Sequence, residues 1–283
     1  MAGRRYYSIR TGKHPLGSKL DLITLLRLFN ALYSDLERRG YFQEAFGYTC
    51  VDAGDVLGTI GADIEAYFLI KLRKDNLWPI RDKDQNYSEE DLFDVIELLY
   101  DHVSKPMDGF DHSYGDCGWH YNTFDQMSGR NEYRTRINEL LKDYKDGYEL
   151  SQEGEILTLA ILGTEALFED NPPLYDEENV DRRVAAAIDT FRRYHSSLED
   201  KRNAVKALAD VLEFLKPKLK EVLTRADEND LFEVANKFGI RHHNEKQKTD
   251  YDQAIWLDWM FYYYLATVNA TIRLINKNNE HST

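Results

Sequence analysis

The sequence predicts a mainly α-helical protein with two domains: an N-terminal α-rich domain over residues 1–168 and a C-terminal helical bundle over residues 177–278. Apolar residues recur at helical spacing through most of the chain, and capping residues and glycines stand at the ends of these patterns. Between the two groups of helices lies LFEDNPPLYDEENVD, which is acidic, contains prolines and has few aliphatic residues. Such a stretch is typical of a boundary between packed units.

Three helices are predicted in the first hundred residues. The first has apolar residues at helical spacing from Leu20 to Leu36, with Ser18 as its predicted cap and Gly40 at its end. A glycine-rich loop and a short helix over residues 64–74 follow. Ser88 is predicted to cap the third helix, SEEDLFDVIELLYDHVS, because its first turn is acidic and the helix dipole favours acids there.

The chain changes character after this helix. KPMDGFDHSYGDCGWHYNTFDQMSG is aromatic and rich in glycine, which predicts a connection, and NEYRTRINELLKDYKDG predicts a helix. YELSQEGEILTL then alternates and turns at its Glu-Gly pair, which predicts a small β-hairpin near residues 148–159. This is the only strand pair that the sequence indicates.

The C-terminal domain is predicted to contain four helices. They are VDRRVAAAIDTFRRYHSS, EDKRNAVKALADVLEFLKPKLKEVLTRA, DENDLFEVANKFG and YDQAIWLDWMFYYYLATVNATIRLIN. Pro217 is expected to kink the second helix, because proline removes a backbone donor and clashes with the preceding turn. The aromatic density of the last helix indicates a core or a dimer interface. Apolar stripes on these helices would pack as a bundle.

Composition narrows the class of protein. The net charge of −14 argues against non-specific binding to nucleic acid, although residues 1–20 and 181–248 are mildly basic. We expect a cytoplasmic protein, because the chain opens without an apolar leader. We expect no membrane span, because Asp258, Asn269 and Arg273 interrupt the long apolar stretch. Cys50 and Cys117 are too few for a disulfide framework and are interpreted as reduced thiols.

A candidate catalytic cluster lies in IRHHNEKQKT, between two predicted bundle helices. Arg241 suits the binding of a phosphate, His242 and His243 suit acid-base work near neutral pH, and Asn244 suits a fixed donor. Metal-independent RNA cleavage needs such a set of a base and stabilising cations. The alternative interpretation is a polar linker whose histidines only cap helices and form hydrogen bonds.

Two further groups of residues would support this cluster. Tyr251 and Asp252, at the start of the last helix, would steady the imidazoles. Five basic residues are candidate RNA contacts: Lys201, Arg202, Lys206, Lys246 and Lys248. The alternative for the helical lysines is an ordinary solvated polar face.

Two other clusters suggest a metal, although the sequence argument favours no metal and no cofactor. His112, Cys117 and His120 are ligand types that suit zinc, but no fourth ligand stands at a recognisable spacing. The second cluster would suit a carboxylate-metal nuclease and consists of Asp52, Asp55, Asp63 and Glu65. A lysine motif that would complete such a nuclease is missing.

Part of the chain resembles a known family. RRVAAAIDTFRRYHSSLEDKRNAVKALADVLEFLK, LFEVANKFGIRHHN and the aromatic last helix resemble the abortive-infection C-terminal and HEPN-type helical domains of prokaryotic defence proteins. GWHYNTFDQMSGRNEYRTRINELLKDYKDGYELSQEGEILTL is similar to the end of the N-terminal domain of AbiJ-type abortive-infection proteins. The resemblance implies a HEPN-like bundle that cleaves or binds RNA as a homodimer, with arginine and histidine from two protomers at the interface.

The chain departs from the pattern of that family at the motif itself. Family members have an arginine, usually a polar residue, and a histidine several residues later. Here His242 and His243 follow Arg241 at once, and lysines and a glutamine occupy the later positions. Two hypotheses remain: a defence-associated endoribonuclease of altered geometry, or a catalytically inactive HEPN-like module that binds a partner protein or RNA in a multi-component anti-phage system.

Overall fold

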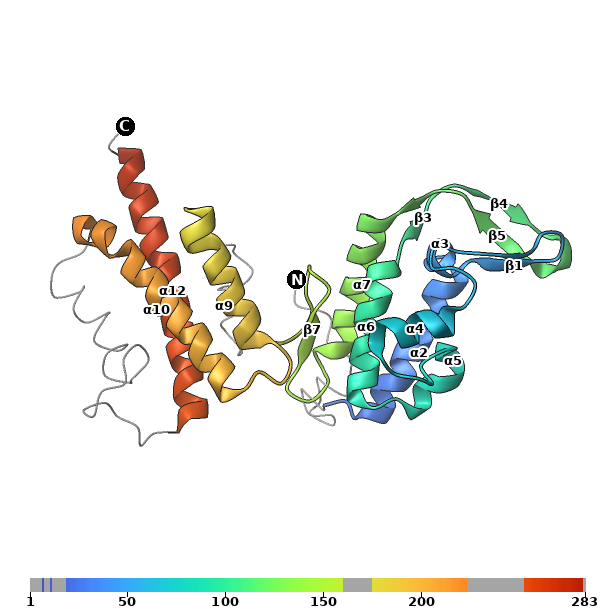
Figure 1. Ribbon diagram of the computed structural model, residues 1–283, viewed down its shortest axis with the longest axis horizontal. Coiled ribbons are helices and arrows are strands. Elements are labelled where there is room, and N and C mark those ends of the chain that lie inside the picture. Colours follow the sequence, from blue (N-terminus) through green and yellow to red (C-terminus); the bar gives the residue numbers. More distant parts are fainter. Residues whose placement is uncertain (1–6, 8–10, 12–18, 160–174, 223–251, 282–283) are drawn as a thin grey trace. The chain divides into compact units, whose positions relative to one another are not determined.

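A computed structural model of the chain describes residues 7, 11, 19–159, 175–222 and 252–281 (Figure 1). The chain divides into two compact units, residues 1–159 and residues 160–283. Helices dominate the described residues of both, which confirms the mainly α class. None of the described helices is both long enough and apolar enough to cross a membrane.

The first unit is built around long helices that pack side by side. Its helices are α2 (Leu22–Arg38), α3 (Gln43–Phe46), α4 (Ile64–Leu72), α5 (Ile80–Lys83), the 3₁₀ turn η1 (Asp84–Asn86), α6 (Glu89–His102) and α7 (Gln126–Leu141). Phe29 of α2, Leu99 of α6 and Ile137 of α7 are at most 1% exposed. The buried Tyr133 hydroxyl donates to the Ile96 carbonyl at 3.1 Å and ties α7 to α6. These helices form the body from which the strands extend.

Local capping chemistry explains the helix ends. Ser88 caps α6, as predicted, and the structure shows that it does so in a reciprocal capping box with Asp91. Gly40 follows α2 with φ +84°, a conformation that favours glycine. The predicted cap of α2 was wrong: Asp21 accepts from the Thr24 amide at 2.8 Å, whereas Ser18 lies outside the described residues. Asp21 is better placed because the helix begins at Leu22.

The strands in the described part of the chain form four two-stranded antiparallel sheets. The predicted hairpin is present as β7 (Tyr148–Leu150) and β8 (Ile156–Thr158). The other three pairs are β1 (Tyr48–Cys50) with β2 (Gly54–Val56), β3 (Lys105–Pro106) with β6 (Phe124–Asp125), and β4 (Gly109–His112) with β5 (Gly118–Tyr121). The expectation of a single hairpin was therefore wrong. These strands are two to four residues long and rich in glycine and aspartate, so they lack the apolar alternation that identifies a strand.

The second unit is a helical bundle. Its described elements are η3 (Glu177–Asp181), α9 (Arg182–Arg192), α10 (Leu198–Val222) and α12 (Gln253–His281). The core lies where α9, α10 and α12 meet, and the Phe191 and Phe261 rings stack there with centroids 3.7 Å apart. Pro217 lies within α10. The predicted helix over DENDLFEVANKFG falls outside the described residues.

Candidate metal centre

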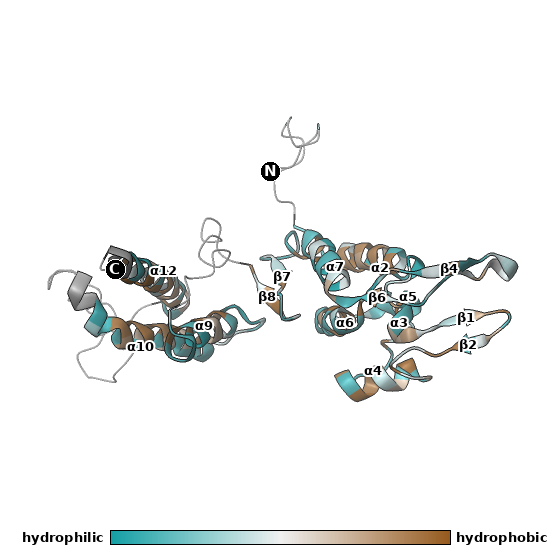
Figure 2. Ribbon diagram, turned by 90° about the horizontal axis from the view of Figure 1, so that it is seen from above, coloured by the Kyte–Doolittle hydropathy of each residue, from teal (hydrophilic) through white to brown (hydrophobic). Residues whose placement is uncertain are grey.

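Two hairpins, β1–β2 and β4–β5, project together from the helical body of the first unit (Figures 1 and 2). We call this pair the double hairpin. Close backbone approach fixes the base of β1–β2. A Cβ on Gly47, whose φ is +77°, would lie 2.0 Å from the Val56 carbonyl oxygen, and a Cβ on Gly58 would lie 2.1 Å from that of Ala45. Only glycine fits such contacts, so these residues set where the hairpin leaves α3.

The second hairpin is attached to the body through α3. Gln43 accepts from the Tyr121 amide at 2.7 Å and donates to the Trp119 carbonyl at 3.0 Å, so one side chain holds the edge of β5. The Tyr121 ring lies over Gly40, where a Cβ would come within 2.4 Å of it. The amide and the ring contact together fix the direction in which β5 extends.

A buried tyrosine, Tyr41, links the end of α2, next to α3, to α7. Tyr41 donates to Glu132 of α7 at 2.5 Å, and Arg39 pairs with the same carboxylate at 3.0 Å. Burial, together with the hydrogen bond to Glu132, raises the pKa of Tyr41 to about 12. Tyr41 is therefore a neutral donor at physiological pH and keeps α7 against the end of α2.

Four ligand-type side chains converge between the two hairpins. Cys50 ends β1, His112 ends β4, Cys117 precedes β5 and His120 lies within β5. One potential ligand atom from each lies within 4.8 Å of all the others. Among the described residues, this is the only such group of three or more histidine, cysteine or acidic side chains.

The individual contacts have the pattern of a metal site. The Cys50 Sγ atom is 3.5 Å from His112 Nδ1, and the Val51 amide donates to Cys117 Sγ at 3.3 Å, as amides do to a thiolate. His120 is 3% exposed, and its Nε2 atom is buried without a hydrogen-bond partner among the described residues. A buried ring nitrogen without a partner costs free energy unless something binds it. A metal ion between the four side chains would satisfy it.

The donor set fits zinc. Two thiolates and two imidazoles are the ligands of tetrahedral zinc, which binds sulfur at about 2.3 Å and nitrogen at about 2.0 Å. Ligand atoms around such an ion lie about 3.3–3.8 Å apart. The Cys50–His112 separation of 3.5 Å already falls in that range. Four protein ligands would leave no position open on a tetrahedral ion, so a zinc ion held here would be of the structural rather than the catalytic type.

Asp52 orients one of the ligands. Its Oδ2 atom is 3.1 Å from Nε2 of His112, whereas Nδ1 of the same ring faces Cys50. A carboxylate that accepts from the second ring nitrogen fixes the tautomer and makes the imidazole a stronger ligand. Nδ1 of His112 is therefore the atom that would bind a metal, and Nε2 is the atom that faces Asp52.

The structure adds one residue to the zinc-type cluster found in the sequence. His112, Cys117 and His120 lie together, and Cys50 is the fourth ligand that spacing alone missed, because 62 residues separate it from His112. The only available signal was that it is the sole other cysteine in the chain.

The acidic cluster proposed from the sequence is dispersed. Asp63 caps α4 through the Ala66 amide, and Asp55 accepts from Thr49 across the β1–β2 pair. Asp52 supports His112, and Glu65 lies in the first turn of α4. The four carboxylates therefore lie in separate local environments and do not form one metal site.

Most residues of the candidate catalytic cluster, and several that would support it, lie outside the described residues. The catalytic candidates among them are Arg241, His242, His243 and Asn244, and the supporting and RNA-contact candidates are Tyr251, Lys246 and Lys248. Asp252 is described, and it caps α12 by accepting from the Ala254 amide at 3.1 Å.

Three basic residues of α10 were predicted to contact RNA, and two of them bind side chains of α12. Lys201 forms an ion pair with Asp258 at 2.7 Å, and Arg202 donates to Gln253 at 3.0 Å. Lys206 is exposed. Two of the three predicted RNA contacts on this helix therefore attach α10 to α12.

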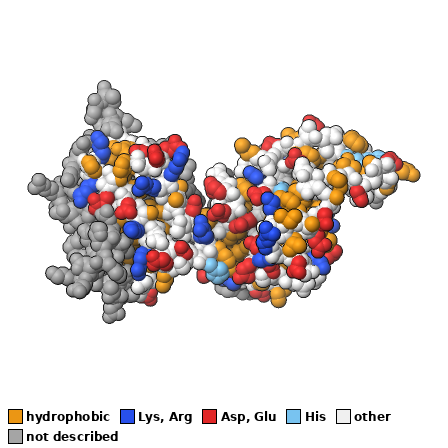
Figure 3. All heavy atoms as spheres, in the orientation of Figure 1, with side chains coloured by type: hydrophobic (Ala, Val, Ile, Leu, Met, Phe, Trp, Pro, Cys, Tyr) orange, Lys and Arg blue, Asp and Glu red, His pale blue; other side chains and the backbone are white. Residues whose placement is uncertain are grey.

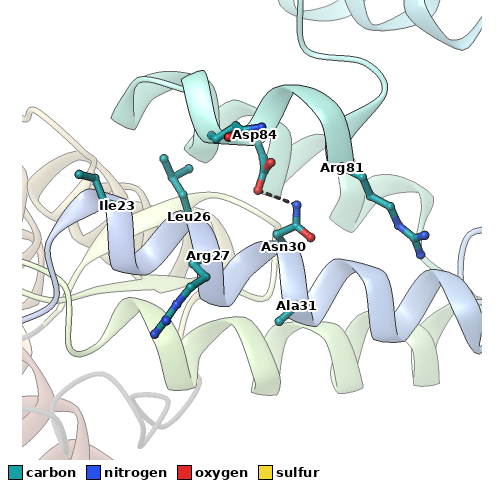
Figure 4. Close-up of a pocket in the computed structure, with 8 residues that line it drawn as sticks. Ile23, Leu26, Arg27, Asn30, Ala31, Arg81 and Asp84 are labelled. Carbon is teal, nitrogen blue, oxygen red and sulfur yellow. Dashed lines mark hydrogen bonds between the residues drawn. The ribbon is translucent and has the colours of Figure 1, made fainter.

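A separate groove of about 450 Å³ lies between α2 and the α5–η1 segment (Figure 4). The buried Asp84 accepts from Asn30 at 2.8 Å on its wall, and Arg81 pairs with Glu37 at 2.5 Å. These polar groups bind one another, so they serve the packing of α2 against α5.

Comparison of the chain with protein-family models, with curated proteins and with solved structures finds no match. The donor set and geometry of the double hairpin are therefore the features of the chain that indicate a function.

We predict that the chain purified without chelator contains one zinc ion. Cys117→Ser and His120→Ala should each abolish stoichiometric zinc, because a three-ligand remnant loses most of the affinity. His102→Ala is the matched control, since His102 lies in the same unit and contacts Tyr67 instead. Inductively coupled plasma mass spectrometry measures the content, and zinc that survives both ligand substitutions would contradict the assignment.

We also predict that Asp52→Asn weakens zinc binding by about 10- to 100-fold, because the His112 ring loses its carboxylate partner. Asp55→Asn is the control, as this carboxylate lies three residues further along the same hairpin and contacts Thr49. Competition with a chromogenic zinc chelator gives both affinities. Equal affinities for the two variants would remove Asp52 from its assigned role.

Proposed function

We propose that the chain is a recognition protein whose N-terminal unit contains a structural zinc site, with Cys50, His112, Cys117 and His120 as ligands. The observation that supports this most strongly is the convergence of four ligand-type side chains between two hairpins, with one potential ligand atom from each within 4.8 Å of the others. One of the four, His120, also has a buried ring nitrogen without a hydrogen-bond partner among the described residues. The role of zinc would be to hold the double hairpin in one conformation for binding.

The size of the hairpins explains why they need a metal. Their strands are three or four residues long, and isolated two-stranded hairpins are at best marginally stable in water. Cys50 is the only side chain of β1–β2 that is fully buried. A bound ion supplies the cohesion that a hydrophobic core supplies in larger domains.

The ligand set favours binding over catalysis. Zinc has no redox chemistry, and in a closed Cys₂His₂ site it offers no position for water or substrate. The residues of this site would therefore orient the surface of the double hairpin. Reactive chemistry, if the protein performs it, would belong elsewhere in the chain.

A defence-associated role of the abortive-infection type is the second proposal, and it rests on the resemblance of the C-terminal segments. Within it, two versions differ: a metal-independent endoribonuclease acting through Arg241 and His243, or a catalytically inactive HEPN-like module that binds a partner protein or RNA. The engagement of Lys201 and Arg202 with α12 favours the inactive version, because it removes cations from an RNA surface. Either version would act as a homodimer under the resemblance.

We predict two unfolding transitions in differential scanning calorimetry, only one of which depends on zinc. Removing the metal should lower the transition of the first unit by roughly 5–15 °C, since loss of a structural metal costs several kcal/mol and each kcal/mol is worth about 2–4 °C. Phe261→Ala, in the core of the second unit, identifies the other transition by lowering it alone. If chelation shifts neither transition, the structural role of zinc is wrong.

The endoribonuclease version predicts RNA cleavage in the presence of chelator by the wild-type chain and none by Arg241→Ala or His243→Ala. The inactive version predicts no cleavage by any of the three. Gel analysis of transfer and messenger RNA distinguishes them, with zinc content measured in parallel. Cleavage that is equal in all three proteins would reject the proposed site and indicate a contaminant or another centre.

A further inference from the structure

We propose that the outer face of β4–β5 binds a segment of a partner protein that is rich in arginine or lysine. The inference rests on the proposed function, because the zinc site would hold this face in position. The surface centres on Trp119 and Asp111.

The strand register places these two side chains together. Asp111 pairs with Trp119, and Phe110 pairs with His120. Residues directly opposite each other in an antiparallel pair share a face, and alternate residues point to opposite faces. His120 belongs to the metal cluster, so Trp119 and Asp111 lie on the face turned away from it.

Trp119 is held in place although it is exposed. The indole is 53% exposed, and it stacks on Tyr121 with ring centroids 5.8 Å apart and an interplanar angle of 18°. Tyr121 in turn lies over Gly40, and Gln43 binds the backbone of both aromatic residues. A fixed, exposed tryptophan loses little conformational entropy on binding, which is why such residues serve as interface anchors.

The charge of the double hairpin selects the partner. Residues 41–70 and 106–129, which include both hairpins, contain no lysine or arginine. Their acidic residues are Glu44, Asp52, Asp55, Asp63, Glu65, Asp108, Asp111, Asp116 and Asp125. Such a surface repels the phosphates of nucleic acid and attracts cationic side chains.

An indole beside a carboxylate is a specific receptor for a cation. Trp is the best aromatic partner for a guanidinium or ammonium group over its ring, and Asp111 adds an ion pair to the same group. Two further exposed apolar side chains flank β4 in the sequence: Met107 is 57% exposed and Tyr114 is 72% exposed. Figure 3 shows hydrophobic, acidic and histidine side chains at the end of the first unit where the hairpins project. Exposed apolar groups amid acids fit a basic polypeptide that also has apolar residues.

The test is a fluorescence-anisotropy titration of the zinc-loaded full chain with a labelled peptide of alternating arginine and glycine. A peptide with citrulline in place of arginine keeps the shape and removes the charge. We expect binding of the arginine peptide only, weakened about 2- to 30-fold by Trp119→Ala. Asp111→Asn should weaken binding and reduce its dependence on salt. Trp256→Ala, at a partly exposed tryptophan of α12, is the matched control and should leave affinity unchanged.

Zinc content, measured for every variant, separates this inference from the proposed function. Zinc-loaded protein that binds both peptides equally, binds neither, or prefers an RNA oligonucleotide overturns the inference alone. Unchanged affinity in Trp119→Ala also overturns it. A chain that contains no zinc but still binds the arginine peptide through Trp119 would overturn the zinc proposal and support the proposed binding face of β4–β5.

Discussion

The double hairpin depends on one long-range convergence: the Cys50 thiol at the end of β1 meets two imidazoles and a second thiol from the β4–β5 hairpin. The strands on either side are too short to bury a core between them, so ordinary packing cannot fix their relative position. Turn geometry adds a second contact, because Gly115 of one hairpin lies against Val51 of the other. These contacts, together with the Tyr48 ring that packs on His120 with centroids 4.2 Å apart, hold the two hairpins against each other.

The helices of the first unit act as a platform for the hairpins. α2 ends at the point from which α3 and β1 start, and the polar chain of Arg39, Tyr41 and Glu132 fastens that point to α7. Gln43 continues the attachment to β5. The four ligand-type side chains of the proposed zinc site are thus held from two directions: by the hairpin turns, and by the helices to which the hairpins are attached. Such preorganisation keeps the entropic cost of metal binding small.

The two units differ in the chemistry that they offer. The double hairpin is acidic and aromatic, whereas the described bundle has basic residues, of which Lys201 and Arg202 bind α12. We propose that the first unit binds basic polypeptides, and the second unit is a helical bundle. Such a pair of units is suited to a protein that works as one component of an assembly. The residues proposed for RNA cleavage belong to a different part of the chain from the proposed zinc ligands. The ribonuclease proposal and the zinc proposal can therefore be tested independently of each other.

The sequence by itself determined the longer helices that the structure describes, because their apolar periodicity acts over a few residues. Ser88 with Asp91 and Gly40 are local signals of this kind, and the β7–β8 hairpin also has one in its alternation and Glu-Gly turn. Three of the four zinc-type ligands stand close enough in sequence to be noticed. Only the tertiary structure decided that Cys50 completes the set, that Asp52 orients His112, and that Trp119 faces away from the metal. The physical reason is that these relations depend on the register of short, glycine-rich strands and on contacts across 62 residues, for which local periodicity contains no information.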